Sequence, residues 1–314
     1  MTVTDLAQFT PTAGGPVEAV EGRSPWQLAW ARLRGDKTAI VSTVVIVLLV
    51  AVALGAPLIA KLVGHGPNDQ FHDTGLTIDG LPVGPSHRFL LGTDNLGRDI
   101  LVRVVYGARI SLTVGVVSTL IATVAGVVVG LLAGYYRGVI DTALSRFMDV
   151  VLAFPFLLFA IALVSVFRPS LVISVGVIAF FSWAAIGRIV RGQTLSLREK
   201  EFVEAAHSLG CSDLRIMFVD ILPNLVAPVI VLATLLIPTA IVFEATLSFL
   251  GLGVAPPTAT WGGIVSDSLS FYRVAWWFPL FPGLALLATT LAFNLLGDSV
   301  RDALDPAAQR ALAQ

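Results

Sequence analysis

Long apolar stretches recur along this chain, and each is close to the length that a helix needs to cross a lipid bilayer. A crossing takes about 20 residues, because about 30 Å of hydrocarbon is covered at about 1.5 Å per residue. The sequence therefore predicts an all-α polytopic membrane protein with six transmembrane helices. The expected spans are residues 38–62, 110–135, 150–167, 171–189, 224–250 and 278–296.

Composition agrees with this fold class and excludes several functions. Of the 314 residues, 56% are hydrophobic and 13% are charged, whereas a soluble domain carries about twice that charged fraction. The formal net charge of −1 gives no indication of a nucleic-acid partner. The single cysteine, Cys211, has no partner for an internal disulfide, and the four histidines form no cluster with it. We therefore expect no metal site.

The distribution of Lys and Arg predicts the orientation of the spans. An even number of spans places both termini on one side, and cytoplasmic loops carry the excess of basic residues. With the N-terminus inside, thirteen basic residues fall on the cytoplasmic side and seven outside, most of the seven in a long loop where the rule weakens. We therefore expect cytoplasmic tails over residues 1–37 and 301–314 and an extracytoplasmic loop over residues 63–109.

Small and acidic residues predict how the second span begins and packs. Gly126, Gly130 and Gly134 recur every four residues, so one helical face lacks side chains and permits close approach of another helix. Packing inside the bundle is favoured over a contact between subunits. Asp94 and Asp99 precede an apolar pattern with helical spacing, and turn and cap roles are favoured over calcium binding.

The loop over residues 190–223 is the most informative soluble segment. Its composition favours a helix that stops at Gly210 and a second short helix whose N-cap is Ser212 or Asp213. Pro223 then falls in the first turn of the fifth span, where its missing N–H costs least.

The first of these loop helices carries a small, close-approach surface. Ala205 and Ala206 form it, and Glu204 and Leu209 flank it. Such a surface suits docking into a groove of another protein. It also suits a helix that lies against the chain's own cytoplasmic ends, and the spacing alone does not choose between the two.

The chain lacks the motifs of enzymes. It has no phosphate-binding Gly-x-x-x-x-Gly-Lys-Ser/Thr loop, no Gly-x-Ser-x-Gly elbow and no His-Glu-x-x-His pair. We therefore expect neither catalysis nor ATP hydrolysis by this chain.

Glu244 is the exceptional ionisable residue deep within a span, and an unpartnered carboxylate there is costly. A hydrogen bond inside the bundle is favoured over substrate contact, because one carboxylate makes no proton relay.

The same loop resembles the signature of a known protein family. It reads Glu204-Ala205-Ala206, then Gly210 after three residues, and Leu222-Pro223 after a spacer. This resembles the cytoplasmic signature of the permease subunits of binding-protein-dependent ABC importers, and it departs from that signature at Asp220, where the family has isoleucine. Further matches to the second (C-type) permease of the dipeptide, oligopeptide and nickel branch lie at Leu91-Gly92-Thr93-Asp94, Tyr106-Gly107-Ala108-Arg109, Glu244-Ala245-Thr246-Leu247 and Gly297-Asp298-Ser299-Val300.

The resemblance implies a type I ABC importer transmembrane domain over residues 110–300, with one additional N-terminal helix, in the cytoplasmic membrane of a prokaryote. It implies a homologous second permease, one or two ATPase subunits that hold ATP and Mg²⁺, an extracytoplasmic substrate-binding protein and contact with membrane lipid. No cofactor is expected on this chain, and peptides are the expected substrate. The implied ATPase-coupling residues are Glu204, Ala205, Ala206, Gly210, Leu222 and Pro223.

A stand-alone secondary carrier or channel is the alternative function. The scarcity of charge within the spans and the size of the loop over residues 190–223 stand against it, because a carrier has no need of such a loop.

Overall fold

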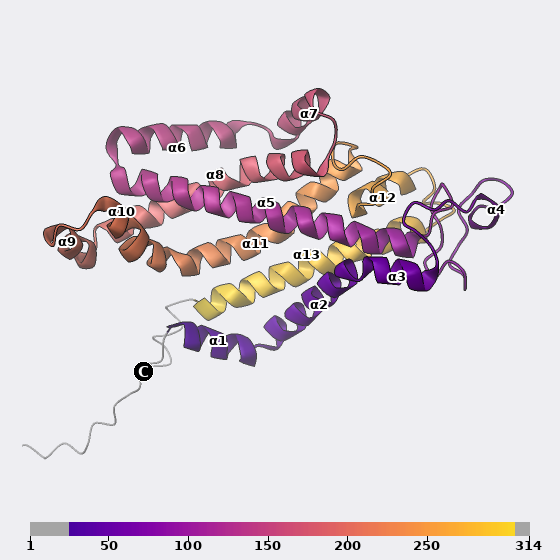
Figure 1. Ribbon diagram of the computed structural model, residues 1–314, viewed down its shortest axis with the longest axis horizontal. Helices are drawn as coiled ribbons and strands as arrows, with labels where there is room; N and C mark the ends of the chain where they lie inside the picture. Colours follow the sequence, from indigo (N-terminus) through magenta and orange to yellow (C-terminus); the bar gives the residue numbers. More distant parts are fainter. Residues whose placement is uncertain (1–24, 305–314) are drawn as a thin grey trace, which may run out of the picture.

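The computed structural model describes residues 25–304, and the outer parts of both predicted tails, 1–24 and 305–314, lie outside the described residues. The regular secondary structure of the described residues is helical, apart from two isolated β-bridges. Its helices form an elongated bundle with α9 toward one end and α4 toward the other (Figure 1). The elements are α1 (Pro25–Gly35), α2 (Lys37–Leu54), α3 (Ala56–Val63), α4 (His72–Gly75), α5 (Ile100–Tyr136), α6 (Gly138–Ala153), α7 (Phe156–Val166), α8 (Leu171–Arg198), α9 (Glu201–Ser208), α10 (Asp213–Arg215), the π-helix η1 (Ile216–Ile221), α11 (Leu222–Phe249), α12 (Trp261–Ser268) and α13 (Trp277–Leu304).

Five helices of the described chain are long and apolar enough to cross a membrane. They are α2, α5, α8, α13 and the continuous run Asp213–Phe249, which includes α11. The helices α6 and α7 form a pair bent by 84°, which makes a sixth crossing if the two halves act as one span. The predicted all-α membrane fold is confirmed.

The first predicted span, residues 38–62, is two helices rather than one. The break lies at Gly55, whose N–H bonds the carbonyl of Ala51 at 2.8 Å and whose own carbonyl accepts the N–H groups of Leu58 and Ile59 at 2.9 Å. Pro57 explains the break, because it has no N–H to donate to the preceding turn and its ring crowds that turn.

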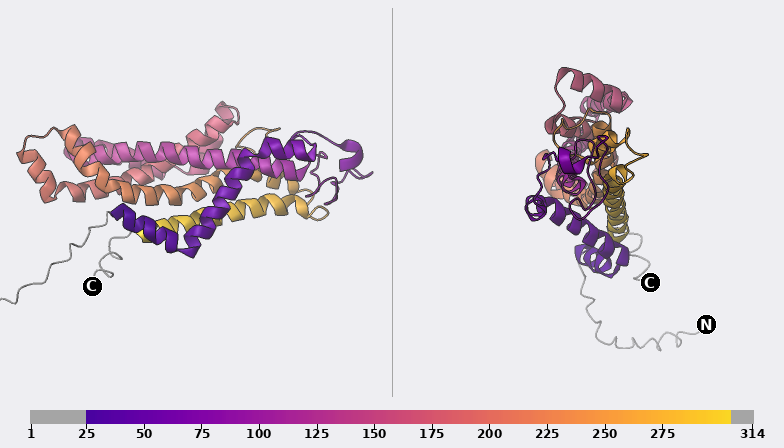
Figure 2. Two further views of the ribbon diagram at one scale, coloured as in Figure 1. Left: turned by 60° about the horizontal axis from the view of Figure 1, so that its bottom comes forward. Right: turned by 90° about the vertical axis from the view of Figure 1, so that its right-hand side faces the viewer.

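The predicted span over residues 150–167 is also not a single helix. Helix α6 begins well before it and ends at Ala153, and α7 starts at Phe156. Between them Phe154 is extended, because Pro155 disfavours the helical conformation of the residue before it. The end-on view in Figure 2 shows α6 and α7 at one edge of the bundle and the N-terminal helices at the opposite edge.

The most extensive helix packing among the described residues joins α5 to α8, along the predicted glycine face. A Cβ atom added at Gly130 lies only 2.5 Å from the carbonyl oxygen of Gly187, and one added at Gly126 lies 2.7 Å from that of Trp183. At Gly134 the carbonyl oxygen of Arg191 is 2.8 Å away. Backbone meets backbone at these points, so the predicted role in packing inside the bundle is confirmed.

The end of the loop before α5 is organised by its two aspartates. Asp94 accepts the backbone N–H groups of Leu96 and Arg98 at 2.9 Å and pairs with the guanidinium of Arg98 at 2.6 Å. Asp99 caps α5 by accepting the N–H of Leu101 at 2.8 Å, and it also pairs with the imidazole of His65 at 2.7 Å. The predicted turn and cap roles are confirmed. Helix α5 begins directly after Asp99, so the apolar pattern that follows Asp99 and the second predicted span form one 37-residue helix.

Two tryptophans join the end of this loop and the first turns of α5 to other parts of the bundle. The indole N–H of Trp277 donates to the carbonyl of Thr93 at 3.3 Å, and that of Trp261 donates to the carbonyl of Val104 at 2.9 Å.

Nearby on α12, burial raises the pKa of the Asp267 carboxyl, while the guanidinium groups of Arg98 and Arg103 oppose the shift.

At the opposite end of the bundle, the described N- and C-terminal segments touch. The hydroxyl of Ser299 on α13 donates to Asp36, the N-cap of α2, at 2.6 Å. This hydrogen bond lowers the pKa of the Asp36 carboxyl, with help from the backbone N–H of Thr38. Arg32 of α1 donates to the carbonyl of Ala303 at 3.4 Å. Both ends of the described chain therefore lie at the same end of the bundle as α9 (Figure 1).

Candidate functional site

The first helix predicted in the loop over residues 190–223 is α9, which projects at one end of the bundle between α8 and α10 (Figure 1). Helix α8 runs on to Arg198, beyond the predicted end of the fourth span. Two residues, Glu199 and Lys200, then turn the chain into α9. The long helix α8 therefore carries α9 outward from the membrane-crossing part of the bundle.

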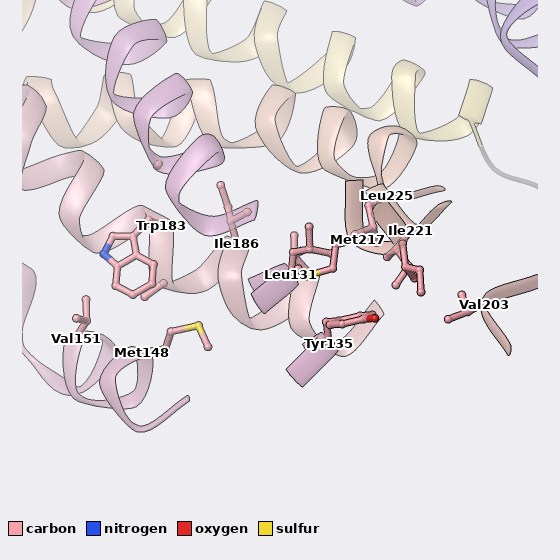
Figure 3. Close-up of a cluster of buried hydrophobic side chains, with 14 of the residues drawn as sticks. Leu131, Tyr135, Met148, Val151, Trp183, Ile186, Val203, Met217, Ile221 and Leu225 are labelled. Carbon is pink, nitrogen blue, oxygen red and sulfur yellow. The ribbon is translucent and has the colours of Figure 1, made fainter. Parts of the chain in front are cut away.

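Helix α9 separates the two alanines of the signature onto opposite faces. Val203 and Ala206 are buried and join the main hydrophobic cluster (Figure 3 labels Val203 beside Ile221). Glu204, Ala205 and Leu209 are exposed, Leu209 by 83%. The expected packing against the chain's own bundle is therefore seen on one face of the helix, and docking on the other face stays a prediction. Its inner face lies against the chain's own bundle, and its outer face is a small, open surface.

The corner after α9 depends on Gly210. Its φ angle is +74°, in the left-handed region that L side chains rarely adopt. The N–H of Gly210 donates to the carbonyl of His207 at 2.9 Å, and the N–H of Cys211 donates to that of Ala206 at 3.1 Å. This pattern satisfies the last carbonyls of the helix and turns the chain sharply. The structure therefore places Gly210 at the helix stop expected from the sequence.

Beyond the corner, the chain continues as one helix into the membrane-crossing part. Leu222 is half-buried and Pro223 is exposed in the first turn of α11, but the helix starts earlier, at Asp213. The preceding turns over Ile216–Ile221 are a π-helix. Pro223 has no N–H to donate to the preceding turn, and the wider π turn accommodates that missing hydrogen bond. The expected separate second helix is therefore the first part of the fifth span.

A polar contact that the sequence analysis missed lies beneath α9. Tyr135, at the end of α5, is buried, and its hydroxyl donates to the carboxylate of Asp213 at 2.8 Å. Its ring stacks on the imidazole of His207 at 6.2 Å between ring centroids. The available signal was an aromatic residue at the end of an apolar span, a position typical of the membrane interface.

Glu244 lies in the middle of the bundle and is fully buried. The hydroxyl of Ser111 on α5 donates to one of its carboxyl oxygens at 2.6 Å, and the hydroxyl of Ser248, one turn later on α11, donates to the other at 2.7 Å. No group of metal-ligating side chains gathers around it or elsewhere in residues 25–304. The geometry is that of a hydrogen-bonded structural carboxyl group that ties α5 to α11.

Comparison with known proteins now identifies the family. A family model described as the binding-protein-dependent transport system inner membrane component matches residues 126–310. The chain belongs to this family. A second model, the N-terminal TM domain of oligopeptide transport permease C, matches residues 24–76, which cover α1 to α4. Membership confirms the resemblance to ABC importer permeases and favours that class over a secondary carrier.

Full-length relatives support the same assignment. A dipeptide transport system permease protein of Alkalihalophilus pseudofirmus is 42% identical over 298 residues, which is 94% of each chain. A di/tripeptide transport system permease protein of Pseudomonas aeruginosa is 42% identical over 90% of this chain and 92% of its own length. A glutathione transport system permease protein of Escherichia coli is 43% identical over 90% and 91%, respectively.

Solved structures confirm the fold of this family member. A chain of the MetNI methionine ABC transporter in an inward-facing conformation superposes with a TM-score of 0.55 at 19% identity, covering 66% of this chain and 98% of that one. A second crystal form gives 0.54 at 18% identity, covering 65% and 96%. The predicted type I importer fold is confirmed, and about a third of this chain is additional to the shared part.

Proposed function

We propose that this chain is one of two homologous permease subunits of an ABC importer that carries peptides across a prokaryotic cytoplasmic membrane. The names of its relatives support the substrate class, because relatives at 42% identity over more than 90% of their length are permeases for dipeptides and for di- and tripeptides. Glutathione, the substrate named for another relative, is itself a short peptide.

The outer face of α9 is the observation that carries the coupling part of this proposal. Glu204, Ala205 and Leu209 are exposed at the tip of the bundle, while Val203 and Ala206 fix the helix from below. A small outward face on a fixed helix suits insertion into a groove of another protein. That protein is a cytoplasmic ATPase subunit, which holds ATP and Mg²⁺, since this chain has no phosphate-binding motif.

Movement then passes from the ATPases to the membrane. Closure of the ATPase pair displaces α9, and the helices joined to it, α8 and the run Asp213–Phe249, carry the displacement across the membrane. ATP shifts the gate only by the difference in its affinity for the inward- and outward-facing states. A substrate-binding protein delivers the peptide at the opposite end, and the pathway lies between this chain and the second permease.

The test is purification of the tagged chain, with its genomic neighbours co-expressed, in mild detergent. We expect a second permease and a nucleotide-binding subunit to co-purify and to hydrolyse ATP. Ala205→Phe, which enlarges the exposed face of α9, is expected to abolish recovery of the nucleotide-binding subunit. Ile78→Phe, a substitution at a fully exposed position at the other end of the molecule, is the matched control and retains it.

Two outcomes contradict the proposal. A chain that purifies alone and moves solute in liposomes without ATP is a secondary carrier. Equal recovery of the nucleotide-binding subunit with Ala205→Phe and with wild type places the ATPase contact away from α9.

A further inference from the structure

Four elements meet at the side chain of Tyr135. Tyr135 lies in the last turn of α5, Arg198 ends α8, His207 lies in α9, and Asp213 begins α10. The guanidinium of Arg198 lies 5.6 Å from the centre of the Tyr135 ring, and the imidazole of His207 stacks near-parallel to the ring at 18°. The ring is only 3% exposed.

The hydroxyl of Tyr135 adds a directed link to these ring contacts. It has one hydrogen, which it donates to Asp213 Oδ1 at 2.8 Å. Its oxygen remains free to accept, and His207 Nε2 lies 3.4 Å away. The Tyr135 hydroxyl therefore links α9, through His207, to Asp213, the first residue of the helical run that continues into α11.

Apolar packing around this point fixes distance better than direction. Beneath α9, Val203 contributes to a cluster with Met217, Ile221 and Leu225, all of them aliphatic or thioether side chains. Figure 3 shows Tyr135 at the edge of this cluster with its hydroxyl oxygen at the far end of the ring. Apolar contacts are non-directional, whereas a hydrogen bond weakens steeply when its angle changes. The hydrogen bonds of Tyr135 therefore add a directional restraint to the apolar packing beneath α9.

We propose that Tyr135 is a positioning residue that couples α9 to α5 and to the run Asp213–Phe249, so that a displacement of α9 moves both helices together. This inference rests on the proposed function, since it specifies how the docked helix transmits its motion. Tyr135 acts through Asp213 and His207 and has no part in ATP hydrolysis. When Tyr135 lacks its hydroxyl, α9 moves with the ATPase but displaces the membrane helices less.

The test is Tyr135→Phe in the assembled importer reconstituted into liposomes. This variant keeps the ring, its stacking on His207 and its contact with Arg198, and it removes only the hydroxyl. The control is Tyr136→Phe, which removes the hydroxyl of the neighbouring, 39% exposed tyrosine. Asp213→Asn is the conservative partner variant, because its amide oxygen still accepts from Tyr135.

The readout is substrate transported per ATP hydrolysed, measured together with subunit recovery. A hydrogen bond to an ionised group corresponds to about tenfold in an equilibrium constant, so we expect Tyr135→Phe to lower this ratio by about tenfold. ATPase activity and subunit recovery are expected to stay near wild type. Tyr136→Phe and Asp213→Asn are expected to keep most of the wild-type ratio.

Each other outcome has a distinct meaning. An unchanged ratio with Tyr135→Phe overturns the inference and leaves the proposed function intact. Loss of ATPase activity and of subunit recovery in the same proportion also overturns it, because a purely structural role lowers both without changing the ratio. If the wild-type complex shows no ATP-dependent transport, the proposed function itself fails.

Discussion

At the scale of single residues, Glu244 shows how a buried carboxyl group is accommodated within a bundle. The sequence indicated that it needs a partner, since an unpartnered carboxylate in a span is costly. Ser248 could be predicted as one partner, because it lies one turn later on the same helix. Ser111 lies 133 positions away, and only the packing of α5 against α11 brings the two residues together.

We expect Glu244→Leu to destabilise the protein much more than Glu244→Gln. Leucine leaves the buried hydroxyls of Ser111 and Ser248 without their acceptor, at a cost of about 2 kcal/mol. Glutamine still accepts from one serine and donates to the other. The measurement is the midpoint of thermal unfolding in detergent.

Transport by the Glu244→Gln variant tests whether Glu244 has a role in the pathway besides its role in stability. If Glu244 only joins α5 to α11, Glu244→Gln transports normally. A Gln variant with wild-type stability and no transport assigns Glu244 to the pathway instead.

At the scale of elements, the contact of α5 with α8 depends on glycine. We expect Gly130→Ala to lower stability by about 1–3 kcal/mol, because its methyl group meets the Gly187 carbonyl oxygen and the two backbones must separate. Gly176→Ala on α8 is the matched control, since a methyl group there meets no atom within 4 Å. Alanine also favours helix over glycine, so Gly176→Ala is expected to leave the unfolding midpoint unchanged or to raise it.

The corner after α9 gives a second prediction at this scale. Gly210→Pro is incompatible with a φ of +74° and removes the N–H that bonds His207, so α9 loses its fixed direction. We expect this variant to insert and assemble, to hydrolyse ATP and to transport little. Gly210→Asn, whose side chain tolerates the left-handed conformation, is expected to retain most transport. Normal transport by an assembled Gly210→Pro complex contradicts the lever role of this segment.

The elements also show which features a sequence can predict. Apolar length located the helices, and the motif around Gly210 located the corner, because both depend on local chemistry. The breaks at Gly55 and after Ala153 were missed, since proline is tolerated in some membrane helices and breaks others according to what surrounds it. At Pro223 the structure differs in the opposite direction. The sequence predicts the start of a helix there, but the helix is continuous, because a π turn accommodates the missing hydrogen bond.

At the scale of the whole molecule, the two ends of the bundle differ in how some of their basic residues are held. The α9 end bears Arg32 and Arg34 in α1 and Arg198 at the end of α8. At the α4 end, Arg98 and Arg103 are buried and both pair with Asp94. Buried, paired cations contribute little to an excess of exposed positive charge. These two arginines are among the seven basic residues that fall outside in the expected orientation, and their pairing lowers the exposed positive charge of the α4 end.

This arrangement predicts that the α9 end faces the cytoplasm. Leu209 and Ile78 provide reporters at the two ends, because both side chains are highly exposed. In a chain whose single cysteine is removed by Cys211→Ser, we expect Ile78→Cys in intact spheroplasts to react with a membrane-impermeant maleimide. Leu209→Cys is expected to react only after the membrane is permeabilised. The reverse pattern inverts the topology and, because an ATPase works in the cytoplasm, excludes α9 as its docking helix.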